Sequence, residues 1–192
     1  MTEFRVDEYL ELRLLQESDI DELVKTVQEN LPHLEPWMIW ANDYDVESTK
    51  SFVRKNLETV ANGGPPSFGI FYREKLAGCI GFVKLDRETH VAEIGYWISV
   101  EHEGKGIVTK CCRVLIDHAF NDQQMKLMEI RASSANVRSR AVAERLGFTL
   151  DKIDEGVHPM PGGKFDDLAV YLLQKNPAAS DLHNGRGRKD LV

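Results

Sequence analysis

The sequence has few cysteines and no long apolar run, and these absences exclude several classes of protein. Its three cysteines, Cys79, Cys111 and Cys112, have no metal-binding spacing, and adjacent cysteines rarely pair in a disulfide. A sparse, odd set of cysteines is typical of reduced thiols in the cytoplasm. No apolar run approaches the ~18 residues that span a bilayer, and the N-terminal segment lacks the apolar core of a signal peptide. We therefore expect a cytoplasmic protein without a metal site or a membrane segment.

The chain also lacks an excess of basic residues. It has 24 Lys and Arg against 31 Asp and Glu, which gives a formal net charge of −7 at pH 7. This balance argues against a nucleic-acid-binding surface. It would suit a cationic substrate, although solubility alone also explains it. The 192 residues, 42% of them hydrophobic, are enough for one domain with its own core.

Hydrophobic periodicity and turn residues predict a single mixed α/β domain over residues 1–175. The expected strands cover residues 9–15, 67–72, 76–85, 91–98, 127–133, 148–157 and 165–173. The expected helices cover residues 18–27, 46–61, 107–120 and 137–146. Three consecutive strands before any crossover helix favour a mostly antiparallel sheet of about seven strands over a doubly wound one. Residues 176–192 have little apolar content and are expected to form a flexible tail.

Two local signals mark the first third of the chain. Ser18 and Asp21 predict a capping box at the start of the first helix. In residues 31–44, LPHLEPWMIWANDY, two prolines exclude a long regular helix. The Trp37 and Trp40 side chains of this segment either cap the core or form the wall of a binding cleft.

A glycine turn joins the central strand, which ends in GYWI, to the amphipathic helix that begins near residue 107. The start of a helix presents unpaired N–H groups and a positive dipole end, so a turn such as Gly104-Lys105-Gly106 predicts an anion site. It is not a dinucleotide fingerprint, because position 109 is Thr where that motif has its third glycine. It is not a Walker A loop either, because the four residues required before Gly-Lys are missing.

Three motifs, taken in order, resemble the GNAT superfamily of acyl-CoA N-acyltransferases. They are GYWI at 95–98, EGKGIVT at 103–109 and NVRSRAVAERLGF at 136–148. The segment HLEPWMIW at 33–40 is similar to the branch of Rim-type ribosomal-protein N-terminal acetyltransferases. The resemblance covers about residues 12–173. It implies a GNAT-like sheet splayed at its central strand, direct acetyl transfer from acetyl-CoA to a primary amine, and a homodimer.

The resemblance also implies which residues bind acetyl-CoA. Backbone groups of Ile98, Ser99 and Val100 would pair with the pantetheine arm like a missing strand. The pyrophosphate would bind the N–H groups of the turn and of the helix start, namely Gly104, Lys105, Gly106, Ile107, Val108 and Thr109. Asn136 would bind the amides of the arm, and it would also cap its own helix.

Some charged residues around the turn would favour binding of the pyrophosphate, and others would oppose it. Lys105 and Lys110 would add positive charge near the pyrophosphate. Glu101 and Glu103 would place two carboxylates beside it, which is electrostatically unfavourable unless they point away or pair with cations.

The resemblance implies candidates for proton transfer as well. Ser139, one turn after Asn136, would protonate the leaving thiolate, although a serine inside a helix often bonds its own backbone. Many members of the family carry a tyrosine at the position of Ala143, so here that role is either vacant or passes to Ser139. The base would be Glu93 on the central strand, if its pKa is raised, or His158 beside the last loop. Glu93 fits a surface position on an alternating strand equally well.

The acceptor is left open between a protein and a small molecule. His33, Trp37 and Trp40 are expected at its site, and the N-terminal amine of a ribosomal protein is the first candidate. A polyamine, an aminoglycoside or an amino-acid-like toxin is the second. A non-catalytic acyl-CoA-binding module is the third reading, favoured by Ala143 and the acidic turn.

Overall fold

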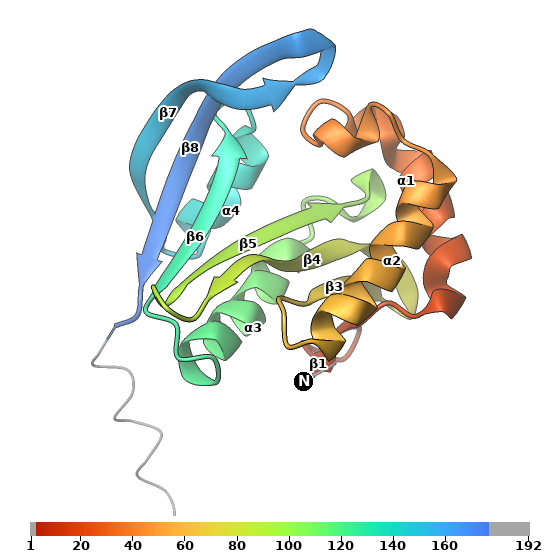
Figure 1. The fold of residues 1–192 in the computed structure, drawn as a ribbon, viewed down its shortest axis with the longest axis horizontal. Coiled ribbons are helices and arrows are strands. Elements are labelled where there is room, and N and C mark those ends of the chain that lie inside the picture. Colours follow the sequence, from red (N-terminus) through yellow and green to blue (C-terminus); the bar gives the residue numbers. More distant parts are fainter. Residues whose placement is uncertain (1–2, 177–192) are drawn as a thin grey trace, which may run out of the picture.

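The computed structural model describes residues 3–176, in which eight strands form one sheet (Figure 1). The strands are β1 (Glu3–Arg5), β2 (Leu10–Arg13), β3 (Ser67–Tyr72), β4 (Lys75–Asp86), β5 (Val91–Ile98), β6 (Leu127–Ser133), β7 (Thr149–Met160) and β8 (Lys164–Gln174). Their order is β1-β2-β3-β4-β5-β6-β8-β7, and every neighbouring pair is antiparallel except β5 and β6. The predicted mixed, mostly antiparallel sheet is confirmed. Only the short β1 was not predicted, because Phe4 alone gives no alternating pattern.

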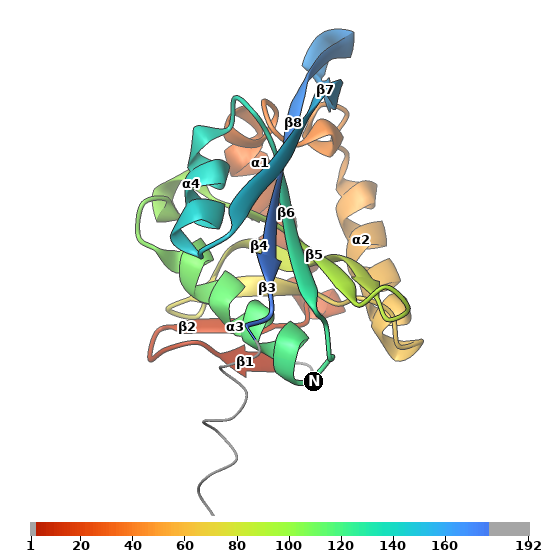
Figure 2. The ribbon, with the colours of Figure 1, turned by 90° about the vertical axis from the view of Figure 1, so that its left-hand side faces the viewer.

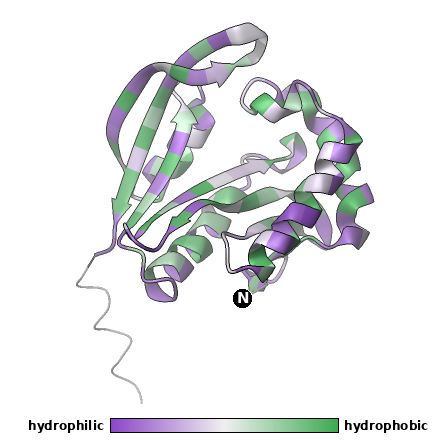
Figure 3. Cartoon of the chain, in the orientation of Figure 1, coloured by the Kyte–Doolittle hydropathy of each residue, from purple (hydrophilic) through white to green (hydrophobic). Residues whose placement is uncertain are grey.

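Helices cover both faces of this sheet. They are α1 (Ile20–Leu34), α2 (Val46–Ala61), α3 (Ile107–Asn121) and α4 (Val137–Arg145). One buried cluster joins α1 and α2 to β3 and β4 through Leu23, Val53 and Cys79. A larger cluster joins α3 and the last turn of α4 to the other face, and it includes Leu115 and Ile94. Figure 2 shows α2 and α4 on opposite sides of the sheet, and Figure 3 shows apolar residues alternating along the strands.

The start of α1 differs from the prediction. A short 3₁₀ turn, Glu17–Asp19, precedes it, and the capping carboxylate is that of Asp19. Asp19 accepts hydrogen bonds from the Gln16 backbone at 2.7 Å and from two Arg13 nitrogens at 2.8 and 2.9 Å. The predicted box of Ser18 and Asp21 is wrong because Arg13, on β2, fixes Asp19 from outside the local sequence.

The helix α1 continues past residue 27, where it was expected to end, and takes in the first residues of the proline-rich segment. The rest of the segment forms no long helix, as the sequence indicates. Pro32 lies within the last turn of α1, which ends at Leu34, two residues before Pro36. Between α1 and α2 only the 3₁₀ turn Ile39–Ala41 is regular. The tail predicted for residues 176–192 lies outside the described residues, apart from Asn176.

The strands β5 and β6 pair only at one end. Their parallel register joins Val91 to Leu127, Ala92 to Met128 and Glu93 to Glu129, and beyond this point the strands diverge (Figure 1). The connection through α3 is the long crossover that parallel neighbours need. The splay implied by the family resemblance is therefore present, and it opens the sheet beside the start of α3 and α4. No helix within residues 3–176 is both long and apolar enough to cross a membrane.

Candidate active site

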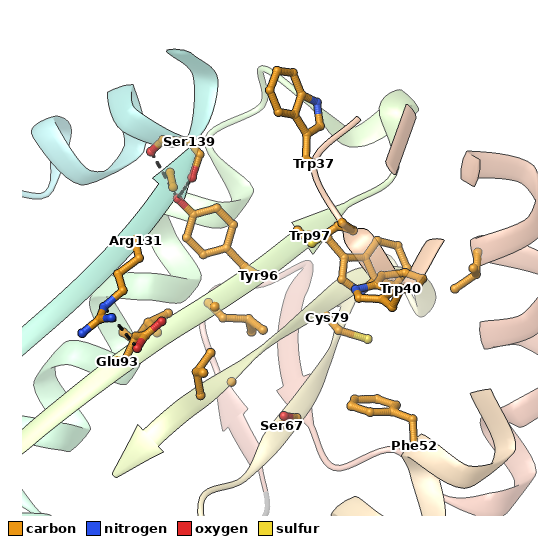
Figure 4. Close-up of a pocket in the computed structure, with 18 of the residues that line it drawn as sticks. Trp37, Trp40, Phe52, Ser67, Cys79, Glu93, Tyr96, Trp97, Arg131 and Ser139 are labelled. Atoms are coloured by element: carbon orange, nitrogen blue, oxygen red, sulfur yellow. Dashed lines mark hydrogen bonds and ion pairs between the residues drawn. The ribbon is translucent and has the colours of Figure 1, made fainter. Parts of the chain in front are cut away.

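Two cavities meet at the splay, and Tyr96 lines both of them. The turn cleft, about 960 Å³, runs along the end of β5, the Gly104–Gly106 turn and α4. The aromatic cavity, about 690 Å³, lies on the α1 and α2 side of the sheet and is lined by Trp40, Phe52 and Trp97 among others (Figure 4). Their shared wall consists of Trp37, Met38, Tyr96, Trp97, Asn136 and Ser139. The two cavities therefore adjoin at these six residues.

The glycine turn exposes its backbone to the turn cleft. Gly104 and Gly106 have φ values of 71° and 72°, a left-handed conformation that favours glycine. No atom lies within 4 Å of the position that a Cβ would occupy on either residue. Gly106 is the N-cap of α3, so the first N–H groups of the helix lack partners within it and lie at its positive end. This arrangement fits the pyrophosphate of acetyl-CoA.

The two acidic residues beside the turn are paired with cations or exposed. The Glu103 carboxylate lies 3.2 Å from His33 Nε2 and accepts a hydrogen bond from Arg138 Nη1 at 2.8 Å. The Glu101 side chain is 76% exposed and lies 3.4 Å from His102 Nδ1. The sequence analysis expects a carboxylate beside the pyrophosphate to be tolerated only if it points away or pairs with a cation. Glu103 meets the second condition, because it pairs with Arg138. The predicted acceptor residue His33 lines the turn cleft and not the aromatic cavity.

The positive charge in the turn cleft comes from arginines that the sequence analysis missed. Arg138 and Arg145 line the cleft from α4, and Arg145 donates to Thr109 Oγ1 at 3.3 Å. Lys110 also lines the cleft, as the sequence predicts, but its ammonium group donates a hydrogen bond to Asp7 at 2.7 Å. The seven-residue spacing of the arginines puts them on one face of α4, two turns apart, and this spacing is the signal that could have found them.

At the end of β5, fewer backbone N–H groups are available to a ligand than the sequence predicts. The Ser99 N–H donates to Ala77 O at 2.7 Å, and the Val100 N–H donates to Asn30 Oδ1 at 2.8 Å. These two N–H groups are therefore not free to bind a pantetheine arm. Successive N–H groups of a strand point to opposite edges, so that of Ile98 points to the splayed side. Ile98 is the residue of this trio whose N–H suits the predicted role.

The side chains of α4 that reach the shared wall are held in place. Asn136 Oδ1 accepts from the Ser139 N–H at 3.0 Å, so the predicted N-cap is confirmed. The Ser139 hydroxyl lies 3.0 Å from the Tyr96 hydroxyl. Burial raises the pKa of the Tyr96 phenol, which therefore stays protonated near neutral pH. The sequence does not predict a role for Tyr96, because the strand motif GYWI does not indicate that this residue contacts α4. Ala143, which stands where many family members have a tyrosine, is fully buried in the core.

Both predicted bases line the aromatic cavity. The Glu93 side chain is 18% exposed, and burial raises the pKa of its carboxyl group. The nearby Arg131 opposes this shift, with Nε 3.5 Å from Glu93, but Arg131 also donates two hydrogen bonds to Glu129, at 2.7 and 3.0 Å. His158 lies on β7, where its backbone is opposite that of Asp166 on the neighbouring strand β8. Within residues 3–176, no three His, Cys, Asp or Glu side chains gather in a way that could hold a metal ion.

Comparison with known proteins agrees with this geometry. Residues 9–149 match the family model "Acetyltransferase (GNAT) domain". The chain is 34% identical over 174 residues to "Putative ribosomal N-acetyltransferase YdaF" of Bacillus subtilis (strain 168), covering 89% of this chain and 94% of that protein. It is 31% identical over 173 residues to the ribosomal-protein-serine acetyltransferase of Escherichia coli (strain K12), covering 89% and 96%.

A solved structure extends the similarity to three dimensions. RimL, the ribosomal L7/L12 alpha-N-protein acetyltransferase in complex with coenzyme A, matches with a TM-score of 0.85 and 26% identity. The match covers 90% of this chain and 97% of that one. The chain thus belongs to the GNAT acetyltransferase family and is an acetyl-CoA-dependent N-acetyltransferase.

Proposed function

We propose that this enzyme acetylates the N-terminal amine of a ribosomal protein. The observation that carries the proposal is the aromatic cavity, which meets the turn cleft at Ser139 and Tyr96. A cavity of about 690 Å³ holds a drug-sized ligand, so it accepts the end of a chain and not a folded surface. Two relatives that cover 89% of this chain are named for acetylation of ribosomal proteins.

In this proposal the turn cleft holds the acetyl donor. The N–H groups from Gly104 to Thr109 bind the pyrophosphate, with Arg138 and Arg145 supplying positive charge. The Asn136 side chain binds the pantetheine arm, and the Ile98 N–H is reserved for the thioester at the end of that arm. His33 contributes at this cleft, through Glu103, and Trp37 and Trp40 line the acceptor side.

The chemistry requires one base and one acid at the shared wall. Acetyl-CoA supplies the acetyl group as a thioester, and the acceptor amine must be neutral to attack it. Glu93 or His158 takes the proton of the amine, directly or through water. Ser139, bonded to the protonated Tyr96, donates a proton to the departing sulfur. The Ile98 N–H lies on the splayed side, where it can polarise the carbonyl.

Mass spectrometry of ribosomal proteins and small amines tests this function. We expect purified enzyme and acetyl-CoA to acetylate the N-terminus of one or a few ribosomal proteins, with a reaction that lacks enzyme as the control. Acetylation of a polyamine, an aminoglycoside or a toxin, with no ribosomal protein modified, would overturn the proposal. Parallel reactions with Glu93→Gln and His158→Gln identify the base, because only the variant that lacks it loses turnover.

We extend the proposal to a cytoplasmic homodimer in which residues 1–175 form one domain. Its support is the family resemblance and the location of ribosomal proteins. Light scattering should give twice the 21.8 kDa of one chain. A single cooperative unfolding transition is expected for a single domain, and two separate transitions would contradict it.

A further inference from the structure

The aromatic cavity has two chemically different ends (Figure 4). At one end lie the charged and hydroxyl groups of Glu93, Arg131 and Ser139. At the other end the rings of Trp40, Trp97 and Phe52 face the same space around Cys79, and the polar group labelled there is the hydroxyl of Ser67. The reacting groups are at the first end, so the second end is available for another part of the acceptor.

The aromatic end of the cavity contains two large aromatic side chains that are partly exposed. Trp40 and Phe52 are 42% and 39% exposed, although they come from different elements and both line the cavity. The rings of Trp40 and Trp97 lie 6.3 Å apart, centre to centre. Behind them Leu23 and Val27 of α1 are buried and complete an apolar wall. A concave apolar surface of this kind marks a place where a ligand is desolvated.

The charge of the cavity argues against a polycation. Glu93 is the single carboxylate among the described residues that line it, and Arg131 lies 3.5 Å away. Besides Glu93 and Arg131, the described residues of the lining that can carry charge near neutral pH include only His158. A polyamine or an aminoglycoside would bring several ammonium groups into a space that offers one partly neutralised carboxylate, and burying unpaired charges is costly.

We infer that the acceptor is a peptide with a bulky apolar side chain in its first two residues, which binds between Trp40, Phe52 and Trp97. This inference rests on the proposed function and specifies its substrate class. The amine would lie at the Glu93 and Ser139 end while the side chain enters the aromatic end. The enzyme would then select apolar N-termini and reject polycationic amines.

Two series of peptides test the inference with the full-length enzyme. In each series the peptides differ at one position only, residue 1 or residue 2, which is Phe, Leu, Ser or Lys. A methylene in an apolar pocket changes kcat/KM by roughly 10- to 200-fold. We therefore expect Phe or Leu to exceed Ser at least about tenfold in one of the series, with Lys the poorest.

Substitutions in the wall connect this preference to the cavity. Phe52→Ala and Trp40→Ala should each lower the ratio of kcat/KM for the Phe peptide to that for the Ser peptide, by about fivefold or more. Phe52→Leu, which keeps an apolar side chain, should retain most of the preference. The control is Tyr9→Ala, since Tyr9 is an aromatic residue of similar exposure, 49%, that lines neither cavity.

The possible outcomes separate this inference from the function on which it rests. Equal kcat/KM for Phe, Leu and Ser peptides in both series would overturn the inference while N-terminal acetylation stands. A preference that survives both alanine substitutions would also overturn it. If no peptide is acetylated but a polyamine is, the proposed function itself fails.

Discussion

The turn cleft and the aromatic cavity are built from different parts of the chain. The turn cleft presents backbone N–H groups from one short stretch, Gly104–Thr109, whose conformation two glycines make possible. The aromatic cavity presents side chains from α1, α2 and several strands. A backbone site tolerates changes of side chain and suits a donor shared across a family. A side-chain site changes with each substitution, so it is where members of the family can differ in acceptor.

The largest effect should follow from removing the contact at the shared wall. Ser139→Ala should lower kcat about a hundredfold, the loss typical of a general acid, with little change in the KM for acetyl-CoA. The matched control is Ser134→Ala, because the buried Ser134 hydroxyl has no hydrogen-bond partner among the described residues. Steady-state kinetics measure both. An unchanged kcat in the Ser139 variant would remove this residue from the chemistry.

The dependence of kcat/KM on pH should identify the general base on the acceptor side. Because burial raises the pKa of Glu93, this carboxyl group becomes protonated at a higher pH than an exposed one, and a protonated carboxyl cannot accept a proton. The kcat/KM should therefore fall as the pH decreases through that raised pKa. Glu93→Gln should lower kcat/KM by roughly tenfold to a hundredfold at neutral pH and abolish this acidic limb. A limb that persists in Glu93→Gln but disappears in His158→Gln would assign the base to His158.

The donor side should be sensitive to a side chain in the turn. Gly106→Ala places a Cβ on a residue with φ of 72°, which costs about 1–2 kcal/mol, and it distorts the N–H groups of the helix start. We expect the Kd for acetyl-CoA, measured by calorimetry, to rise about tenfold. Gly63→Ala is the matched control, since Gly63 has φ of 77° and equally free space but lines neither cavity. It should lose similar stability and keep its affinity; equal affinity in both variants would contradict the role of the turn.

The smallest expected effect is a gain of affinity. Glu103→Gln removes a carboxylate from the turn cleft and frees Arg138 to bind phosphate. The Kd for acetyl-CoA should fall about two- to fivefold at low salt, and the gain should shrink at high salt, where charges are screened. Glu101→Gln should change little, because that side chain is exposed. A weaker affinity in Glu103→Gln would mean that Glu103 positions Arg138 for binding.

The sequence predicts features that depend on neighbouring residues, and it does not predict contacts between residues that are far apart along the chain. The turn at Gly104–Gly106 and the cap at Asn136 follow from neighbouring residues, and the structure has both. The contact of Ser139 with Tyr96 joins residues 43 positions apart, so no periodicity could indicate it.

Charge pairing shows the same limit. Lys110 lines the turn cleft, as expected, but its ammonium group pairs with Asp7, 103 positions earlier in the chain. The partners of Glu103 come from α1 and α4, and the N–H of Val100 is taken by Asn30 of α1. Identifying these partners requires the packed fold, because residue type alone does not say which of many charges lies nearby.

The short pairing of β5 with β6 gives the sheet two internal edges. Edge strands carry rows of unpaired N–H and C=O groups that can recruit another chain and begin aggregation. In this protein those rows lie in the middle of the sheet, beyond Glu93 and Glu129, where β5 and β6 diverge. A donor that occupies the gap would restore the missing ladder. Acetyl-CoA would then act as a removable strand that protects the enzyme from self-association as well as supplying its acetyl group.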